Sequence, residues 1–247
     1  NQSNQRFDHY QYADATLING TSPQSTGTPL PGGTVDAVDS EKISNIGYNF
    51  KGGLGFVLDE AEENKAYVNA GYYSRQPFHD NLFTQFNNQV SPGAQNETII
   101  GFEAGYSYNT RTFKANVNLY RTTWKDRVVS STRVVGGDVQ NTFNFGIEQL
   151  HSGVEVDFLA RLTDGFKFNG FMSAGNWQFK GTSTTEVRDD ETRDLISTSE
   201  DDVEGGKVGD AAQFTLGFGI DVDLAERFSW DADFRFYDRL YADVGAV

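Results

Sequence analysis

The sequence predicts an all-β fold, specifically a segment of an antiparallel transmembrane β-barrel, and three observations lead to it. Apolar and polar residues alternate through most of the chain, and no segment shows a competing helical period. Short and long connections between these segments follow one another in strict alternation. The chain is polar overall, with a mean hydropathy of −0.53 and a net charge of −15, yet its apolar residues concentrate at every second position of the predicted strands.

The alternation is clearest between Phe214 and Leu224, where every even-numbered residue is apolar and every odd-numbered one is polar or glycine. Successive side chains of a strand point to opposite faces, so this pattern predicts one apolar and one polar face. The same reasoning predicts strands at 48–58, 66–72, 100–108, 113–120, 154–162, 168–174 and 228–237, and a ninth, poorly patterned strand at 5–12.

The connections between these strands fall into two classes that alternate along the chain. Four are short (59–65, 109–112, 163–165 and 225–227) and four are long (13–46, 74–97, 126–149 and 181–209). Bacterial outer-membrane barrels have short periplasmic turns, long extracellular loops, an apolar face toward lipid and a polar face toward the lumen. A soluble β-sandwich also alternates, but it does not explain why the long connections gather at one end.

The number of strands indicates that the predicted barrel is larger than this chain. About nine strands is an odd number, whereas single-chain bacterial barrels have even numbers. The first and last strands would both run outward, which places their ends on opposite sides of the membrane. We therefore expect residues 1–247 to form part of one larger β-barrel domain.

Composition argues against several classes of function. The chain has 35 acidic and 20 basic residues, so it lacks the basic surface that nucleic acid or an anionic leaflet would require. It has no cysteine, which excludes disulfides and thiolate metal sites. His9, His79 and His151 show no spacing typical of a metal site or a nucleophile relay. The sequence therefore predicts neither an enzyme nor a cofactor.

Two further groups of residues are assigned to the predicted faces. Aromatic residues near strand ends are expected to form interfacial girdles: Tyr72, Tyr73, Tyr106, Tyr108, Trp124, Trp177, Tyr237 and Tyr241. Charged residues of both signs within strands are expected to line the lumen: Glu155, Asp157, Arg161, Asp231, Asp233 and Arg235.

Several stretches together resemble a known family of barrels. They are residues 48–53 (YNFKGG), 68–78 (VNAGYYSRQPF), 96–106, 118–127 (NLYRTTWKDR), 153–157 (GVEVD) and 236–243 (FYDRLYAD). In this order and spacing they resemble the C-terminal β-barrel portion of TonB-dependent outer-membrane receptors, of the Bacteroidetes type. The resemblance covers most of residues 46–244.

The resemblance implies a barrel of about 22 strands whose lumen is plugged, with the plug domain and the final strands absent from this chain. It implies a multi-pass protein of the Gram-negative outer membrane that takes up a nutrient ligand (iron chelate, cobalamin, oligosaccharide or peptide). The implied partners are the TonB complex, reached through the plug region, the small-molecule, glycan or peptide ligand, outer-membrane lipid and optionally a surface lipoprotein. The alternative is a soluble or surface-displayed β-sheet protein that binds carbohydrate.

One long connection carries candidates for ligand binding. Arg75, Phe78, His79, Asn81 and Phe83 combine aromatic rings with directional polar groups, which suits sugar stacking or the capture of an aromatic chelate. The alternative is that they pack loop against loop and close the barrel mouth.

The long connection at 181–210 is strongly acidic, with ten acidic and three basic residues. Several carboxylates close together suit calcium, and the candidates are Asp189, Asp190, Glu191, Asp201 and Asp202. The spacing matches no EF-hand, and the alternative is a solvated acidic loop.

Overall fold

The computed structural model describes residues 2–4, 9–12, 35–38, 42–82, 90–91, 93, 95–190, 194–209 and 211–242. Its strands are β1 (Gln2–Asn4), β2 (His9–Tyr12), β3 (Val35–Val38), β4 (Ile43–Asn45), β5 (Tyr48–Val57), β6 (Asn64–Arg75), β7 (Glu97–Asn109), β8 (Phe113–Val135), β9 (Asp138–Thr163), β10 (Phe166–Lys180), β11 (Thr182–Asp189), β12 (Leu195–Asp202), β13 (Phe214–Ala225) and β14 (Phe228–Asp238). Among these residues there is one short helix, α2 (His79–Leu82). Among them, no helix has both the length and the hydropathy needed to cross a bilayer.

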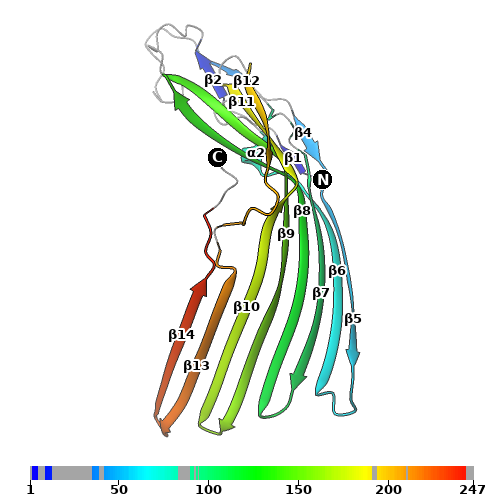
Figure 1. Cartoon of the computed structure of the whole chain (residues 1–247), viewed down its shortest axis with the longest axis vertical. Helices are drawn as coiled ribbons and strands as arrows, with labels where there is room; N and C mark the ends of the chain where they lie inside the picture. The colour runs from blue at the N-terminus through cyan, green and yellow to red at the C-terminus, as the bar shows by residue number, and fades with distance from the viewer. Residues whose placement is uncertain are drawn as a thin grey trace.

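Eight strands form a curved antiparallel sheet, here called the wall, in the order β14-β13-β10-β9-β8-β7-β6-β5 (Figure 1). Neighbours in the wall are consecutive along the chain except at β10 and β13, between which the β11–β12 hairpin is inserted. No pairing joins β5 to β14, so the sheet is open within the residues that the structure describes. This architecture confirms the predicted antiparallel barrel segment.

The predicted ninth strand at 5–12 is described only at residues 9–12, and these form β2 outside the wall. Within the described residues, β1 pairs with β4 and β2 pairs with β3, each pair forming its own small sheet. With eight strands, β5 begins and β14 ends at the same, upper edge of the wall (Figure 1). The odd strand count was therefore wrong, and so was the placement of the two ends on opposite sides.

The lower ends of the strands are joined by four short turns, as predicted, at residues 58–63, 110–112, 164–165 and 226–227. In the first turn the Asp59 carboxylate accepts hydrogen bonds from the Asn64 backbone N–H at 3.0 Å and from its Nδ2 at 2.9 Å. These bonds hold the pKa of Asp59 below its ordinary value, because they favour the ionised form. Glu62, with a φ of 57°, completes the reversal.

The upper ends differ from the prediction, because two of the long connections are largely strand. β8 and β9 continue to a tight turn at Gly136 and Gly137, whose positive φ angles of 64° and 103° suit a hairpin. The acidic segment forms the hairpin of β11 and β12, and β11 also pairs with β9. We call residues 126–149 of β8–β9, together with β11, β12 and α2, the upper lobe (Figure 1).

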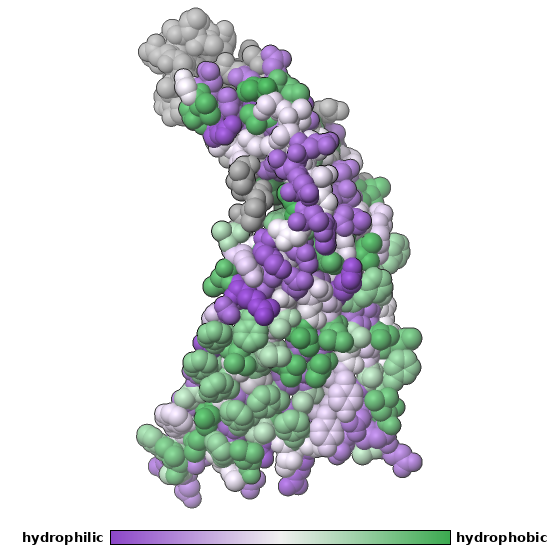
Figure 2. All heavy atoms as spheres, viewed as in Figure 1, coloured by the Kyte–Doolittle hydropathy of each residue, from purple (hydrophilic) through white to green (hydrophobic). Residues whose placement is uncertain are grey.

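Register places the apolar residues of all eight strands on one face. Val117, Val156, Met172, Leu216 and Phe236 follow one another across neighbouring strands. Apolar side chains gather over the lower part of the molecule, with polar ones above them and at the lower edge (Figure 2). We call this belt the apolar band; it contacts lipid in a barrel of this class.

The upper limit of the apolar band on β8, β9 and β10 is marked by outward polar residues in consecutive register, Arg121, Ser152 and Asn176. The opposite face carries the predicted lumen-facing charges. Asn116 donates a hydrogen bond to Asp157 at 2.8 Å, and Tyr67 donates one to Asn118 at 3.1 Å.

The girdle prediction is right for some aromatic residues and wrong for others. Tyr72, Tyr106 and Tyr108 share the apolar face. Tyr73, Trp124, Trp177 and Tyr237 occupy lumen-face register positions instead. Proximity to a strand end does not reveal the face; only the position within the alternation does.

Candidate functional site at the mouth of the wall

Lumen-facing side chains of β6 to β10 meet just above the apolar band and form a cluster of aromatic and charged groups. We call Arg75, Phe78, Glu97, Tyr120, Trp124, Arg127, Gln149, His151 and Trp177 the mouth cluster. Register makes three pairs direct neighbours across strands: Arg75 with Glu97, Trp124 with Gln149, and His151 with Trp177.

An irregularity in β8 brings Arg127 into this cluster. The register of β8 against β9 shifts between Trp124 and Arg127, and Asp126 there has a φ of 61°. Aspartate tolerates the left-handed conformation better than most residues, and a bulge adds a residue that re-aims the following side chain. The bulge therefore lets Trp124 and Arg127, which are three residues apart, face the lumen together.

The centre of the mouth cluster is an ionic group with more positive than negative charge. Glu97 is buried, and its carboxylate accepts from Arg75 Nη2 at 2.5 Å and lies 3.7 Å from Arg127 Nε. Arg127 Nη1 also donates to Gln149 Oε1 at 3.0 Å. Among the described residues, the Nε atoms of both arginines are buried and meet no hydrogen-bond acceptor. Two guanidinium groups against one carboxylate leave a local surplus of positive charge.

Aromatic rings surround the two guanidinium groups. Arg75 lies 4.7 Å from the ring centre of Phe78 and 5.3 Å from that of Trp124, and Arg127 lies 5.5 Å from the Trp124 ring centre. Such contacts contribute about 0.5–1 kcal/mol at exposed sites and more when desolvated. The Phe78 ring remains 59% exposed. It therefore offers a free face at the edge of the cluster.

His151 links the ionic group to a second aromatic pair. It lies within hydrogen-bond distance of Gln149 at 3.2 Å and stacks on Trp177 with ring centres 5.3 Å apart. Burial, and next the positive charge of Arg127, lower the pKa of His151 below its ordinary value. The imidazole is thus kept neutral at neutral pH, and the cluster's surplus charge comes from the arginines.

Two glycines hold the second aromatic pair against the sheet. A Cβ at Gly175 would lie 2.7 Å from Trp177 Nε1, and one at Gly153 would lie 2.6 Å from the Tyr120 hydroxyl. Both rings therefore lie flat over positions without side chains. In this arrangement Trp177 Nε1 donates a hydrogen bond to the Tyr120 hydroxyl oxygen at 2.9 Å. The glycines set the height of the rings above the sheet.

The structure separates the five predicted ligand-binding residues into three groups. Arg75 and Phe78 are in contact within the mouth cluster. Asn81 instead anchors α2, donating to the Val128 carbonyl at 2.9 Å and accepting from the Ser130 hydroxyl at 3.3 Å. His79 belongs to α2, but its side chain lies outside the described residues, as does all of Phe83. Their roles as ligand contacts stay predictions.

Most of the mouth cluster was not found by reasoning from the sequence. The sequence places Trp124 and Trp177 in the lipid girdle, and no pattern in it singles out Glu97, Arg127 or Gln149. Counting every second residue along β8 predicts the correct face for Trp124. It lies in the same alternating series as Asn116, Asn118 and Tyr120, which form the polar face of the strand. The position of Arg127 depends on the bulge, for which the sequence gives no clear signal.

The acidic candidates lie on the β11–β12 hairpin. Asp189 is near its tip, while Asp201 and Asp202 pair with Ser183 and Thr182 at its base. Asp190 is held by Asn141 Nδ2 at 2.6 Å, and Glu191 lies outside the described residues. Within the described part of the chain, no three His, Asp or Glu residues are close enough to hold a metal ion. Calcium binding by this segment stays a prediction, testable by calcium titration.

An open sheet with lipid-facing and lumen-facing sides, short turns below and long hairpins above defines the wall of an outer-membrane β-barrel. The chain matches the family model described as TonB dependent receptor-like, beta-barrel, over residues 5–246. It therefore belongs to this family of receptors, which is located in the outer membrane of Gram-negative cells and crosses it with strands.

One solved structure that resembles this chain is entitled "Copper transporter OprC". The sequences are 14% identical, the TM-score is 0.42, and the match covers 82% of this chain and 34% of the other. The chain thus spans about a third of the length of that structure. A comparison with curated proteins gives no match.

Proposed function

We propose that this chain is part of an outer-membrane receptor that takes up a nutrient ligand by TonB-coupled transport, and that the mouth cluster contacts the ligand. Family membership supports the general mode of transport. The observation that carries the assignment of the site is the surplus positive charge at the mouth, where two guanidinium groups surround one buried carboxylate. As a receptor domain, the wall supplies binding and passage rather than catalysis.

The wall is proposed to be one portion of a larger closed barrel with an internal plug. Backbone groups in lipid must be paired, so a transmembrane sheet needs closure, and β5 and β14 each present an unpaired edge within the described residues. The plug would supply the TonB contact. A surface lipoprotein as a further partner and a Bacteroidetes origin remain proposals of the same kind.

Of the four ligand classes considered, an anionic iron chelate fits the mouth cluster best. Guanidinium groups bind carboxylate and phosphate oxygens through paired donors, and the side chains of Arg75 and Arg127 are still 35% and 29% exposed. An oligosaccharide is the second candidate, because Phe78 presents an exposed ring on which a sugar could stack. The side chains of the mouth cluster favour cobalamin and peptide less specifically than the other two ligand classes.

Uptake by cells that produce the natural full-length receptor tests this proposal. Cells lacking other outer-membrane receptors would be offered ferric citrate, cobalamin, maltohexaose and a tetrapeptide, each labelled, with and without a protonophore. We expect uptake of ferric citrate that the protonophore abolishes while surface binding persists. Receptor-dependent uptake of none of the four, or uptake insensitive to the protonophore, would contradict the proposal.

Site variants connect that uptake to the mouth cluster. Arg127→Gln removes one charge from the lumen face, and we expect ferric citrate binding to weaken about tenfold, the effect of losing one charged hydrogen bond of about 1.5 kcal/mol. Lys125→Gln is the matched control, because Lys125 lies on the outward face of the same strand and pairs with Glu148 at 3.4 Å. Equal effects of both variants would exclude the cluster as the binding site.

A further inference from the structure

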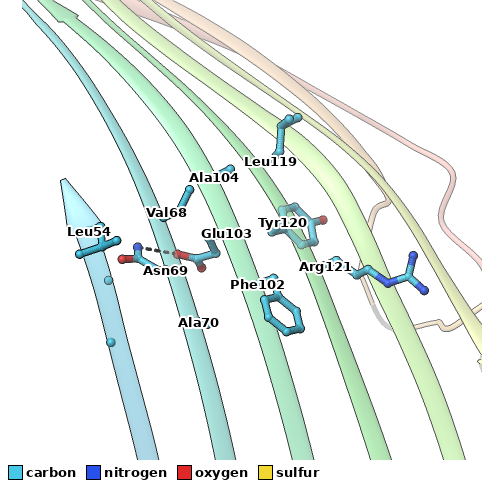
Figure 3. A pocket seen from close by; sticks show the side chains of 12 residues that line it. Leu54, Val68, Asn69, Ala70, Phe102, Glu103, Ala104, Leu119, Tyr120 and Arg121 are labelled. Carbon is cyan, nitrogen blue, oxygen red and sulfur yellow. Dashed lines mark hydrogen bonds between the residues drawn. The ribbon is translucent and has the colours of Figure 1, made fainter. Parts of the chain in front are cut away.

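A groove lies on the outward face of the wall, on the other side of the sheet from the lumen. Its floor is made by small residues, Gly52, Ala70 and Ala104, on three neighbouring strands. Its sides are apolar and include Leu54, Phe102 and Leu119 (Figure 3). The groove has a volume of about 700 Å³. A side chain at Gly52 would meet no atom within 4 Å, so the floor is open at this point.

The groove lies within the apolar band and reaches its upper limit at Arg121. Gly52, Ala70, Phe102 and Arg121 occupy one register line across β5 to β8. All side chains on this line point outward, so the groove opens into the hydrocarbon layer and not into water. An occupant of the groove must therefore come from the membrane.

Arg121 is an exposed cation at the end of this groove. Its guanidinium extends away from the other lining residues (Figure 3). Its cross-strand neighbours, Phe102 and Ser152, carry no charge. No hydrogen bond or ion pair to Arg121 is found among the described residues. By contrast, Lys125, the next outward cation on β8, is paired with Glu148. At Arg121 the upper limit of the apolar band thus carries a positive charge that no acidic residue of the described part of the chain neutralises.

We propose that this groove binds an acyl chain of a membrane lipid of the outer leaflet whose phosphate group is held by Arg121. A guanidinium matches the planar, bidentate geometry of phosphate oxygens better than any other side chain. Its alkyl stem can lie along apolar surface while its charged end stays at the interface. The apolar floor and the cation at the upper limit therefore fit the two ends of one amphiphile.

The net charge of the chain does not oppose this site. Many acidic residues belong to the lumen face and to the β11–β12 hairpin, and salt screens exposed charges beyond about 10 Å. The outward neighbours of Arg121 carry no acid. The net charge is a sum over surfaces that do not face the lipid, so the local charge around Arg121 decides whether an anionic lipid can bind there.

Lipid titration of the full-length receptor in mild detergent, followed by native mass spectrometry, tests the proposal. The probes are diphosphorylated lipid A and the same glycolipid without its phosphates. We expect the phosphorylated form to bind at least tenfold more tightly, and Arg121→Gln to remove this preference. Inorganic phosphate in equal excess should not displace the lipid, because it lacks the chain that fills the groove.

Two pairs of variants separate the charge from the groove. Ala104→Leu fills the floor and should weaken binding of both glycolipids several-fold, whereas Ala232→Leu adds the same atoms to the outward face of β14 and should leave binding within twofold. Lys125→Gln, which removes a paired outward cation, should also leave binding within twofold. Equal binding of the two glycolipids to the natural receptor, or unchanged binding in Arg121→Gln, would overturn the proposal.

Discussion

The apolar band of the wall and the upper lobe share two strands, β8 and β9, yet they place their apolar side chains in opposite ways. In the upper lobe, Phe143 is 1% exposed and Leu82 is fully buried against neighbouring strands. In the band, Phe102 and Phe234 are 56% and 47% exposed, because their partner is lipid. The buried hydrophobic residues of the described chain all lie in or beside the upper lobe: Leu82, Val128, Phe143, Ile147, Phe179 and Val187.

This contrast shows that two different solvents stabilise one continuous hairpin. Above the bulge at Asp126, β8 and β9 need a core of their own because water surrounds them. Below it, backbone pairing and the alternation of faces suffice, because the hydrocarbon layer accepts the apolar side chains. The mouth cluster lies where the two regimes meet. There, protein surrounds the side chains on the lumen face, so charged groups such as Glu97 can be buried next to aromatic rings such as Trp124.

The largest effect is expected from removing the centre of the upper core. Phe143→Ala should destabilise the upper lobe by about 3–5 kcal/mol, since it removes a buried ring and leaves a cavity. Hydrogen exchange should increase in β11, β12 and residues 138–147, while the heat-dependent mobility shift of the folded barrel on SDS gels persists. Phe56→Ala, a lipid-facing control on β5, should leave exchange in the upper lobe unchanged. Loss of the mobility shift in Phe143→Ala would show that the two regions do not differ in this way.

A charge in the centre of the apolar band should have the next largest effect. Phe218→Arg places a guanidinium toward hydrocarbon on β13 and should cost about 2–4 kcal/mol of folding free energy. Asn169→Arg makes the matched change on the lumen face of the neighbouring strand, close to Asp233, and should cost little. Urea unfolding of the receptor in lipid vesicles measures both. Similar costs for the two variants would contradict the assignment of faces.

A smaller effect is expected where the aromatic pair of the mouth cluster lies on glycine. Gly175→Ala would force Trp177 away from the sheet and break its bond to Tyr120, at a cost of about 1–3 kcal/mol. Tryptophan fluorescence should shift and ligand binding should weaken. Gly55→Ala, where a Cβ meets no atom within 4 Å, is the control. An unchanged emission spectrum in Gly175→Ala would mean that the ring is not held by this contact.

The smallest effect concerns acid. The pKa of His151 is lowered in the folded protein by burial and by Arg127, so the unfolded chain binds its proton first as the pH falls. The contribution of neutral His151 to the folding free energy is therefore fully present above the pKa of the unfolded chain, about 6.5. It is lost as the pH falls through the lower pKa of the folded protein. Thermal unfolding between pH 7 and 5 should show this loss around the mouth, and His151→Gln should reduce it. A midpoint that falls equally in both proteins would assign the effect to other groups.

Much of the wall could be predicted from the sequence, because its faces follow a strict two-residue period. Phe214 to Leu224 and the four short turns are examples, and both are confirmed. The upper lobe could not be predicted in the same way. Between Val128 and Val135, and again near Phe143, both faces contact protein or water and not lipid, so the alternation weakens. Chain length alone suggested loops where the structure has hairpins.

The candidate site was predicted in part for a related reason. Arg75 and Phe78 are three residues apart in the sequence, so both are found in the same predicted connection. Glu97, Arg127 and His151 come from three different strands, and only the register brings them together. The left-handed conformation at Asp126, which turns Arg127 into the cluster, has no distinct signature in the surrounding residues, which are of mixed polarity.

One face of the wall contacts lipid and the other contacts the lumen, and cysteine scanning of β13 distinguishes the two faces residue by residue. The chain has no native cysteine, so single cysteines at residues 215 to 220 of the full-length receptor in vesicles can each carry a spin label. We predict that labels at 216, 218 and 220 are relaxed by oxygen, which partitions into lipid, and labels at 215, 217 and 219 by a water-soluble nickel chelate. Equal accessibility at successive positions, or even-numbered positions shielded from both reagents as in a dry protein core, would show that the wall does not separate lipid from lumen.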